Sequence, residues 1–140
     1  MAVNYFDYRA GLGNVGSYQA SAKPYLSSSI HVSSSGDIVR IDFPNVTRFV
    51  TIKNVGPDDG SSDIIMRVGF SENGTNGVEC CNYLLLDNQE SYSADWRVTS
   101  LYMRVDITGT FNATASVIAG MTAIDAGELQ HNWTGSSGVG

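Results

Sequence analysis

The sequence has few of the residues that favour helices or that bind phosphate groups. Lysine occurs only as Lys23 and Lys53, and the eight basic residues are scattered, so no basic stripe is available for direct nucleic-acid binding. Leucine and other strong helix formers are scarce, which favours strands over helices. No apolar run approaches the length of a membrane span. From the scattered basic residues we expect no nucleic-acid partner, and from the short apolar runs no membrane partner.

Cysteine is also rare and occurs only as the adjacent pair Cys80 and Cys81. Neighbouring side chains in a strand point to opposite faces, and a disulfide between them needs a strained turn. We therefore predict two free thiols and synthesis in a reducing place, with a bond to another subunit left open. The start MAVNYFDYRA has neither a positive leader nor an apolar stretch, so we expect no signal peptide.

The residues that are abundant indicate a single all-β domain. Val, Ile, Thr, Tyr and Phe recur in short runs separated by glycine, serine and asparagine, and 140 residues suffice for one sandwich core. The net charge of -6 comes from acids spread along the chain, which favours solubility. A hairpin loop is expected at 73–77, before an apolar run that suits a central strand. The predicted strands are 37–43, 46–55, 63–70, 78–86, 88–92, 98–107 and 111–121.

These strands divide the chain into three parts. Residues 1–36 contain glycines and two serine triplets without sustained periodicity, so we predict an extended N-terminal arm. Residues 37–121 form the body, a single antiparallel β-sandwich. Residues 122–140 form a Gly/Ser-rich C-terminal tail, with a short helical turn at 124–129 and Trp133 as an anchor for an otherwise featureless segment.

No motif predicts catalysis or a cofactor. Residues 11–16 spell the GxGxxG of dinucleotide sites, but no β-branched strand precedes them and a poor helix follows. His31 and His131 lie in the predicted arm and tail, away from any rigid frame that would position a base. Nothing activates Cys80 or Cys81 as a nucleophile, so we predict a protein that is not an enzyme and needs no cofactor.

Two further groups of side chains allow a binding role. Asp58, Asp59 and Asp63 crowd one loop, but their spacing is not that of an EF-hand, and we expect solvated acids and no metal. Aromatic side chains on or beside strands suit stacking on sugar rings and suit core packing equally well. These aromatic residues are Tyr83, Tyr92, Trp96 and Tyr102.

The two ends of the chain are more distinctive than its middle. Residues 11–25 (GLGNVGSYQASAKPY) and 132–140 (NWTGSSGVG) resemble the ends of short virion structural proteins of tailed bacteriophages, particularly aquatic ones. Ala20 and Ala22 depart from the bulkier residues or glycines expected there. The resemblance implies a decoration (cement) protein or small head fibre, commonly a trimer and often a jelly-roll. It would be synthesised in the host bacterial cytoplasm and bind the major capsid protein on the capsid surface.

The resulting hypothesis is a non-enzymatic decoration protein that bridges capsid subunits and thereby stabilises the head shell. Aromatic side chains dominate interface energetics, so the expected contacts are Tyr18, Tyr25 and Trp133, with Arg9 as a charge partner. The alternative is a carbohydrate-binding or host-adhesion module on a virion fibre or tail.

Overall fold

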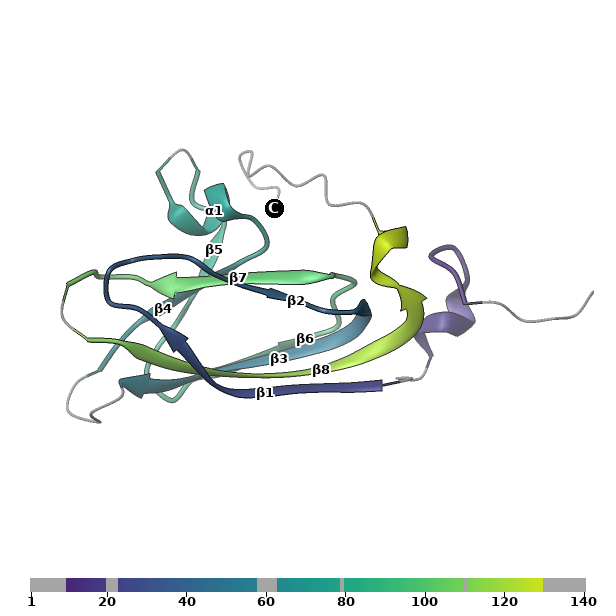
Figure 1. The fold of residues 1–140 in the computed structure, drawn as a ribbon, viewed down its shortest axis with the longest axis horizontal. Coiled ribbons are helices and arrows are strands. Elements are labelled where there is room, and N and C mark those ends of the chain that lie inside the picture. Colours follow the sequence, from purple (N-terminus) through teal and green to yellow (C-terminus); the bar gives the residue numbers. More distant parts are fainter. Residues whose placement is uncertain (1–9, 20–22, 58–62, 79, 110, 130–140) are drawn as a thin grey trace, which may run out of the picture.

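The protein folds as an all-β sandwich of two antiparallel four-stranded sheets, as the sequence predicts (Figure 1). The structure is a computed structural model that describes residues 10–19, 23–57, 63–78, 80–109 and 111–129. The two sheets lie face to face, and their inward side chains form the core between them. None of the helices in these ranges is long and apolar enough to cross a membrane.

The first sheet, sheet A, contains the two longest strands. Its order is β1 (Lys23–Val32), β8 (Ala113–Asp125), β3 (Asn45–Pro57) and β6 (Ser91–Ala94). β3 and β8 pair along most of their 13-residue lengths, with register shifts near both ends. This long ladder forms the centre of sheet A, and β1 and β6 are its edges.

The second sheet, sheet B, is built from shorter strands. Its order is β2 (Val39–Asp42), β7 (Ser100–Val105), β4 (Met66–Gly69) and β5 (Tyr83–Leu86). Pairing is nested along the chain: the first strand pairs with the last, the second with the seventh, the third with the sixth and the fourth with the fifth. The edges β5 and β6 are joined by a short turn and lie on the same side of the sandwich.

The core follows the alternation of side chains along each strand. In β3 the inward residues Val50, Ile52 and Asn54 are fully buried. Lys53 and Val55, which alternate with them along the strand, are exposed. Val, Ile, Leu and Met supply most of the remaining core, and small alanines on β8 let the sheets approach closely. The core is therefore set by the period-two pattern that the sequence shows in its middle.

Among the residues that the structure describes, Asn54 is the one fully buried side-chain amide, and it links the two sheets. Its Nδ2 donates hydrogen bonds to the carbonyl of Ile64 at 2.6 Å and to that of Leu86 in β5 at 3.1 Å. Its Oδ1 accepts from the backbone N–H of Gly56 at 3.0 Å, where the φ of +105° requires glycine. Both polar atoms of the side chain have backbone partners, through three hydrogen bonds in all, so burial of the amide is compensated.

The predicted boundary of the arm at residue 36 is wrong, because β1 lies inside that segment. Tyr25 packs edge-on against Phe43 at 4.9 Å between ring centroids, and Val32 is fully buried. Burying these side chains offsets the ordering of the serines around them. The sandwich body therefore begins at β1.

Two predictions around residues 71–86 also need correction. The expected hairpin loop at 73–77 is a short helix, α1 (Glu72–Asn76), because the Ser71 hydroxyl accepts from the N–H of Gly74 and Gly77 ends the helix at a φ of +76°. The apolar run that follows is an edge strand, not a central one. Its strand portion begins only at Tyr83 and forms the outer edge of sheet B.

Short helices flank the sandwich at one end (Figure 1). η1 (Val15–Tyr18) precedes β1, and η2 (Ala126–Glu128) follows β8. The predicted helical turn at 124–129 is thus confirmed in its centre, while Ile124 and Asp125 still belong to β8. The first and last described elements consequently lie near each other.

Candidate functional site

Of the four predicted contact residues, the structure describes Tyr18 and Tyr25, and these two make different contacts. Tyr18 contacts the sandwich of its own chain. Its backbone carbonyl accepts a hydrogen bond from Arg48 Nε at 2.6 Å, and the centre of its ring lies 5.7 Å from the Arg97 guanidinium. Tyr25 is partly buried and points inward, where it packs against Phe43 of the core. The predicted contacts Arg9 and Trp133 lie outside the described residues.

A row of apolar and hydroxyl-bearing side chains crosses the outer face of sheet A. It begins at Leu26, the exposed neighbour of Tyr25 in the chain. Leu26 of β1 is 72% exposed and pairs with Ile118 of β8, which is 47% exposed. Ile118 pairs in turn with Thr51 of β3, whose hydroxyl lies 2.7 Å from that of Ser93 in β6. The next row contains Pro24, Gly120 and Phe49.

The charge of this face differs from that of the whole chain. Asp125 is the only acid on the four strands of sheet A, and its Oδ1 accepts from the N–H of Gly127 in η2. The same strands carry three basic residues, Lys23, Arg48 and Lys53. Of these, Lys53 lies on the outer face because it alternates with the inward Ile52 and Asn54, whereas Lys23 pairs with the buried Met121. The strands of sheet A thus carry little acidic charge in a chain of net charge -6.

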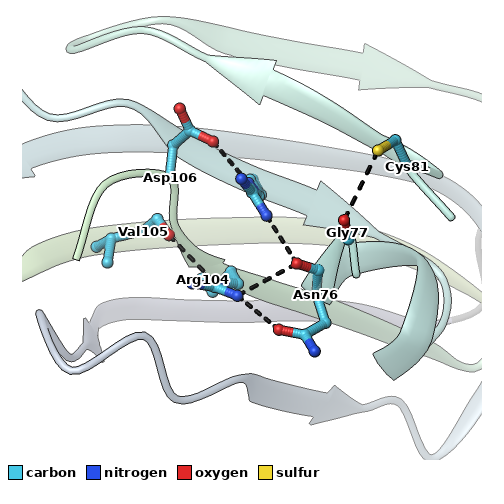
Figure 2. Close-up of polar contacts among 7 residues, drawn as sticks. Asn76, Gly77, Cys81, Arg104, Val105 and Asp106 are labelled. Atoms are coloured by element: carbon cyan, nitrogen blue, oxygen red, sulfur yellow. Dashed lines mark hydrogen bonds and ion pairs between the residues drawn. The ribbon is translucent and has the colours of Figure 1, made fainter. Parts of the chain in front are cut away.

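The outer face of sheet B is charged and partly covered. α1 lies over this sheet in Figure 1 and contacts β4 and β7, whereas the other two described helices contact strands of sheet A, η1 at β8 and η2 at β3. Arg67 donates to Asp106 at 2.6 Å and to the carbonyl of Asn76 at 2.8 Å. Arg104 donates to the side-chain oxygen of Asn76 at 2.6 Å (Figure 2). These bonds fix α1 against the sheet.

A second polar pair lies near the β2 edge of this face. Arg40 donates to Asp42 at 2.7 Å and its guanidinium lies 5.6 Å from the ring of Tyr102. The hydrogen bond to Asp42, with a smaller contribution from Tyr102, raises the pKa of Arg40 above its ordinary value. The side chains are largely exposed, so the pair adds little to stability.

An aromatic pocket of about 390 Å³ lies beside β4, β5 and β6. Three of the four aromatic residues singled out from the sequence line it: Tyr83, Tyr92 and Trp96. The fourth, Tyr102, lies on β7 beside Arg40. The structure thus brings together most of a predicted sugar-binding set that the sequence alone could equally assign to the core.

The pocket walls combine stacked rings with buried aliphatic side chains. Tyr92 and Trp96 lie 5.5 Å apart at an interplanar angle of 32°, and Phe70 meets Trp96 edge-on at 4.8 Å. Ile52 and Val68 from the two sheets also line the pocket. Tyr83 contributes less ring surface, because the Arg67 guanidinium lies 4.4 Å from its centroid. None of the described residues that line the pocket carries a charge.

The other residues considered for chemistry are dispersed. Residues 11–16 contain a turn and the first two residues of η1, a 3₁₀ helix whose N-cap is Asn14. Among the described residues, neither Cys80 nor Cys81 forms a disulfide. Asp63 accepts from the Asn88 side chain at 3.1 Å. Over the described ranges, no three His, Cys, Asp or Glu side chains gather in a way that would hold a metal ion.

The sequence singled out the aromatic residues but not the pair of Leu26 and Ile118. They are far apart in the sequence, and only strand pairing shows that they are neighbours on one face. The chain matches no protein-family model and no curated protein sequence. The features that indicate a function are therefore the outer face of sheet A, the aromatic pocket and the two ends of the sequence.

Proposed function

We propose that this chain is a non-enzymatic structural protein of a tailed-phage virion, a decoration protein on the outside of the head shell. It binds the major capsid protein and bridges neighbouring subunits, which stabilises the shell. The observation that carries the proposal is the outer face of sheet A, with Leu26 and Ile118 exposed at paired positions of adjacent strands. The resemblance of residues 11–25 and 132–140 to the ends of short virion proteins supplies the identity of the partner.

The composition of this face suits protein docking. Exposed aliphatic side chains gain free energy when a partner removes them from water, and hydroxyl groups such as those of Thr51 and Ser93 supply hydrogen bonds around them. Lys53 adds a positive charge next to this row. The face therefore fits an uncharged or acidic surface on the capsid, while the charged face of sheet B suits solvent.

The strand order supports the same proposal through an analogy of fold. The nested pairing, with sheet orders β1-β8-β3-β6 and β2-β7-β4-β5, is the order expected when an antiparallel ribbon is rolled up into two sheets. We therefore propose that the sandwich is a jelly roll, an architecture used by viral capsid and lectin domains. Fold alone does not assign function. The outer face of sheet A therefore remains the main support for the proposed docking.

The proposed assembly is a homotrimer, the state that the resemblance to small decoration proteins implies. Light-scattering mass of the purified chain measures this state directly. A mass of three chains supports the trimer, and a mass of one chain rejects it without affecting the docking proposal.

A pair of matched substitutions tests the docking face. Ile118→Lys places a charge at the centre of the face, whereas Leu85→Lys makes a comparable change on the outer side of β5. The two wild-type side chains are similarly exposed, at 47% and 46%. We expect saturable co-sedimentation of the wild type and Leu85→Lys with expanded head shells from the same source. Ile118→Lys should bind at least about tenfold more weakly, as expected for a central interface residue.

The thermal transition of each variant controls for folding, because both side chains are largely outside the core. Equal shell binding by the two lysine variants would reject sheet A as the docking face. Absence of any wild-type binding to shells would reject the decoration function itself.

One observation favours the alternative of a carbohydrate-binding module. The aromatic pocket contains Tyr92 and Trp96 as a stacked pair in a site without charge. This pocket and the outer face of sheet A are different surfaces, since Tyr92 and its neighbour Ser93 point to opposite sides of β6.

A further inference from the structure

We propose that the aromatic pocket beside β5 and β6 is a binding site for a neutral pyranose sugar. The site is independent of capsid docking, because it lies between the sheets and not on the outer face of sheet A. Its volume of about 390 Å³ is at the lower end of the range for small-ligand sites. That size suits one or two sugar rings.

The ring surface for stacking comes from Tyr92. Its side chain is 41% exposed although it points to the inner side of β6, opposite the buried Ile52 of β3. Trp96 supports the Tyr92 ring at a centroid separation of 5.5 Å, and Phe70 holds the indole edge-on. Support from both rings limits the orientations of Tyr92, so a ligand loses less free energy in ordering the site.

The polar groups of the pocket favour a sugar over a purely apolar ligand. Asn82 contributes an amide to the lining, and its backbone N–H is fixed by a 3.2 Å bond to the Gly74 carbonyl at α1. The phenol of Tyr92 and the indole N–H of Trp96 add polar groups. An aliphatic ligand on the exposed Tyr92 would remove water from its phenol without replacing the hydrogen bonds of that water, whereas the hydroxyl rim of a pyranose replaces them.

The absence of charge among the lining residues defines the class of sugar. A phosphorylated, sulfated or carboxylated ring would lose water from its anionic group without gaining a cationic partner in the pocket. The guanidinium of Arg67, beside the lining residue Tyr83, already lies over the ring of that tyrosine and bonds to Asp106. We therefore expect neutral hexose-containing glycans to bind and their acidic analogues to bind more weakly.

The test uses the full chain, Trp fluorescence and calorimetry. The probes are neutral glucose-, galactose- and mannose-containing oligosaccharides, each compared with a sulfated or carboxylated analogue. At least one neutral probe should bind saturably with one site per chain. Tyr92→Ala should weaken this binding by about tenfold or more through loss of the stacking surface.

Tyr102→Ala is the matched control, because it deletes the same ring from a strand outside the pocket. It should bind the neutral probe as the wild type does. Trp96→Phe keeps an aromatic support and should bind with intermediate affinity, which guards against misreading a variant that fails to fold.

Three results would overturn the proposal. These are the absence of binding by every neutral probe, equal or tighter binding of the acidic analogues, and equal losses in Tyr92→Ala and Tyr102→Ala. None of these results bears on shell docking, which is measured with the Ile118→Lys and Leu85→Lys variants.

Discussion

Replacing Asn54 with alanine should cause a large loss of stability, because the amide makes three hydrogen bonds inside the core. The change removes two donors, to the carbonyls of Ile64 and Leu86, at about 1 kcal/mol each. It also leaves the N–H of Gly56 buried without its acceptor, at a cost of about 2 kcal/mol. The free energy of unfolding should therefore fall by about 4 kcal/mol, and the melting temperature by roughly 10–20 °C.

Urea denaturation followed by Trp fluorescence measures this loss, with calorimetry for the melting temperature. Thr51→Ala is the control on the same strand, since its hydroxyl bonds to Ser93 on the exposed face and its loss should cost less than about 0.5 kcal/mol. A loss below about 1 kcal/mol for Asn54→Ala would refute the reasoning. It would mean that the bond between the sheets contributes little to the folded state.

Three other changes test particular contacts. Gly69→Ala should destabilise the fold by about 2 kcal/mol, measured by urea denaturation, because its Cβ would lie 2.3 Å from the Thr75 hydroxyl; an unchanged midpoint would contradict this. Asp106→Asn should cost about 1–2 kcal/mol by weakening a largely buried pair, and a loss unchanged in 1 M salt would agree with that burial. A thiol reagent should react first with exposed Cys81, and Cys81→Ser should abolish the faster phase; two equal phases would refute the assignment.

The strands in the middle of the chain could be predicted because each has one face in the core. In β7 the buried residues Leu101, Met103 and Val105 alternate with the less buried Tyr102 and Arg104. This period-two alternation of buried and less buried residues does not depend on the order of the strands in the sheet. The sandwich class therefore follows from the sequence.

β1 could not be predicted because a bulge breaks its alternation. Tyr25 points inward on one side of the bulge, and Ile30 and Val32 do so on the other, five and seven residues later. Ser29 takes a φ of +60° between them. Because the inward positions change from one parity to the other at the bulge, the sequence of β1 shows no continuous period-two pattern. Its serines also favour the prediction of an extended arm.

α1 carried a signal that was available in the sequence. Ser71 precedes the acidic Glu72, and Gly77 follows the last helical residue, which are the ordinary cap positions of a helix. The repeated asparagine and glycine favoured a turn instead. A five-residue helix lacks the apolar periodicity that would have decided between the two.

The candidate sites depended on pairing between distant strands, which no local pattern specifies. Residues 92 and 96 are close in sequence, but Ile52 and Val68 reach the same pocket only because β6 pairs with β3 while β4 lies in the opposite sheet. Chemistry-bearing residues were therefore recognisable one by one. Their assembly into a pocket was not.

The nested pairing of strands has a consequence for how the chain reaches this fold. β1 bonds only to β8, so sheet A stays incomplete during synthesis until about residue 125 has left the ribosome. Pairings between residues so far apart in the chain carry a high entropic cost of loop closure and make folding slow. Until then β3 also lacks the partner along its longest edge, so the nascent chain exposes strand edges that pair with other copies. High yields of native protein should therefore depend on slow expression or on chaperones that bind the chain before its last strand is made.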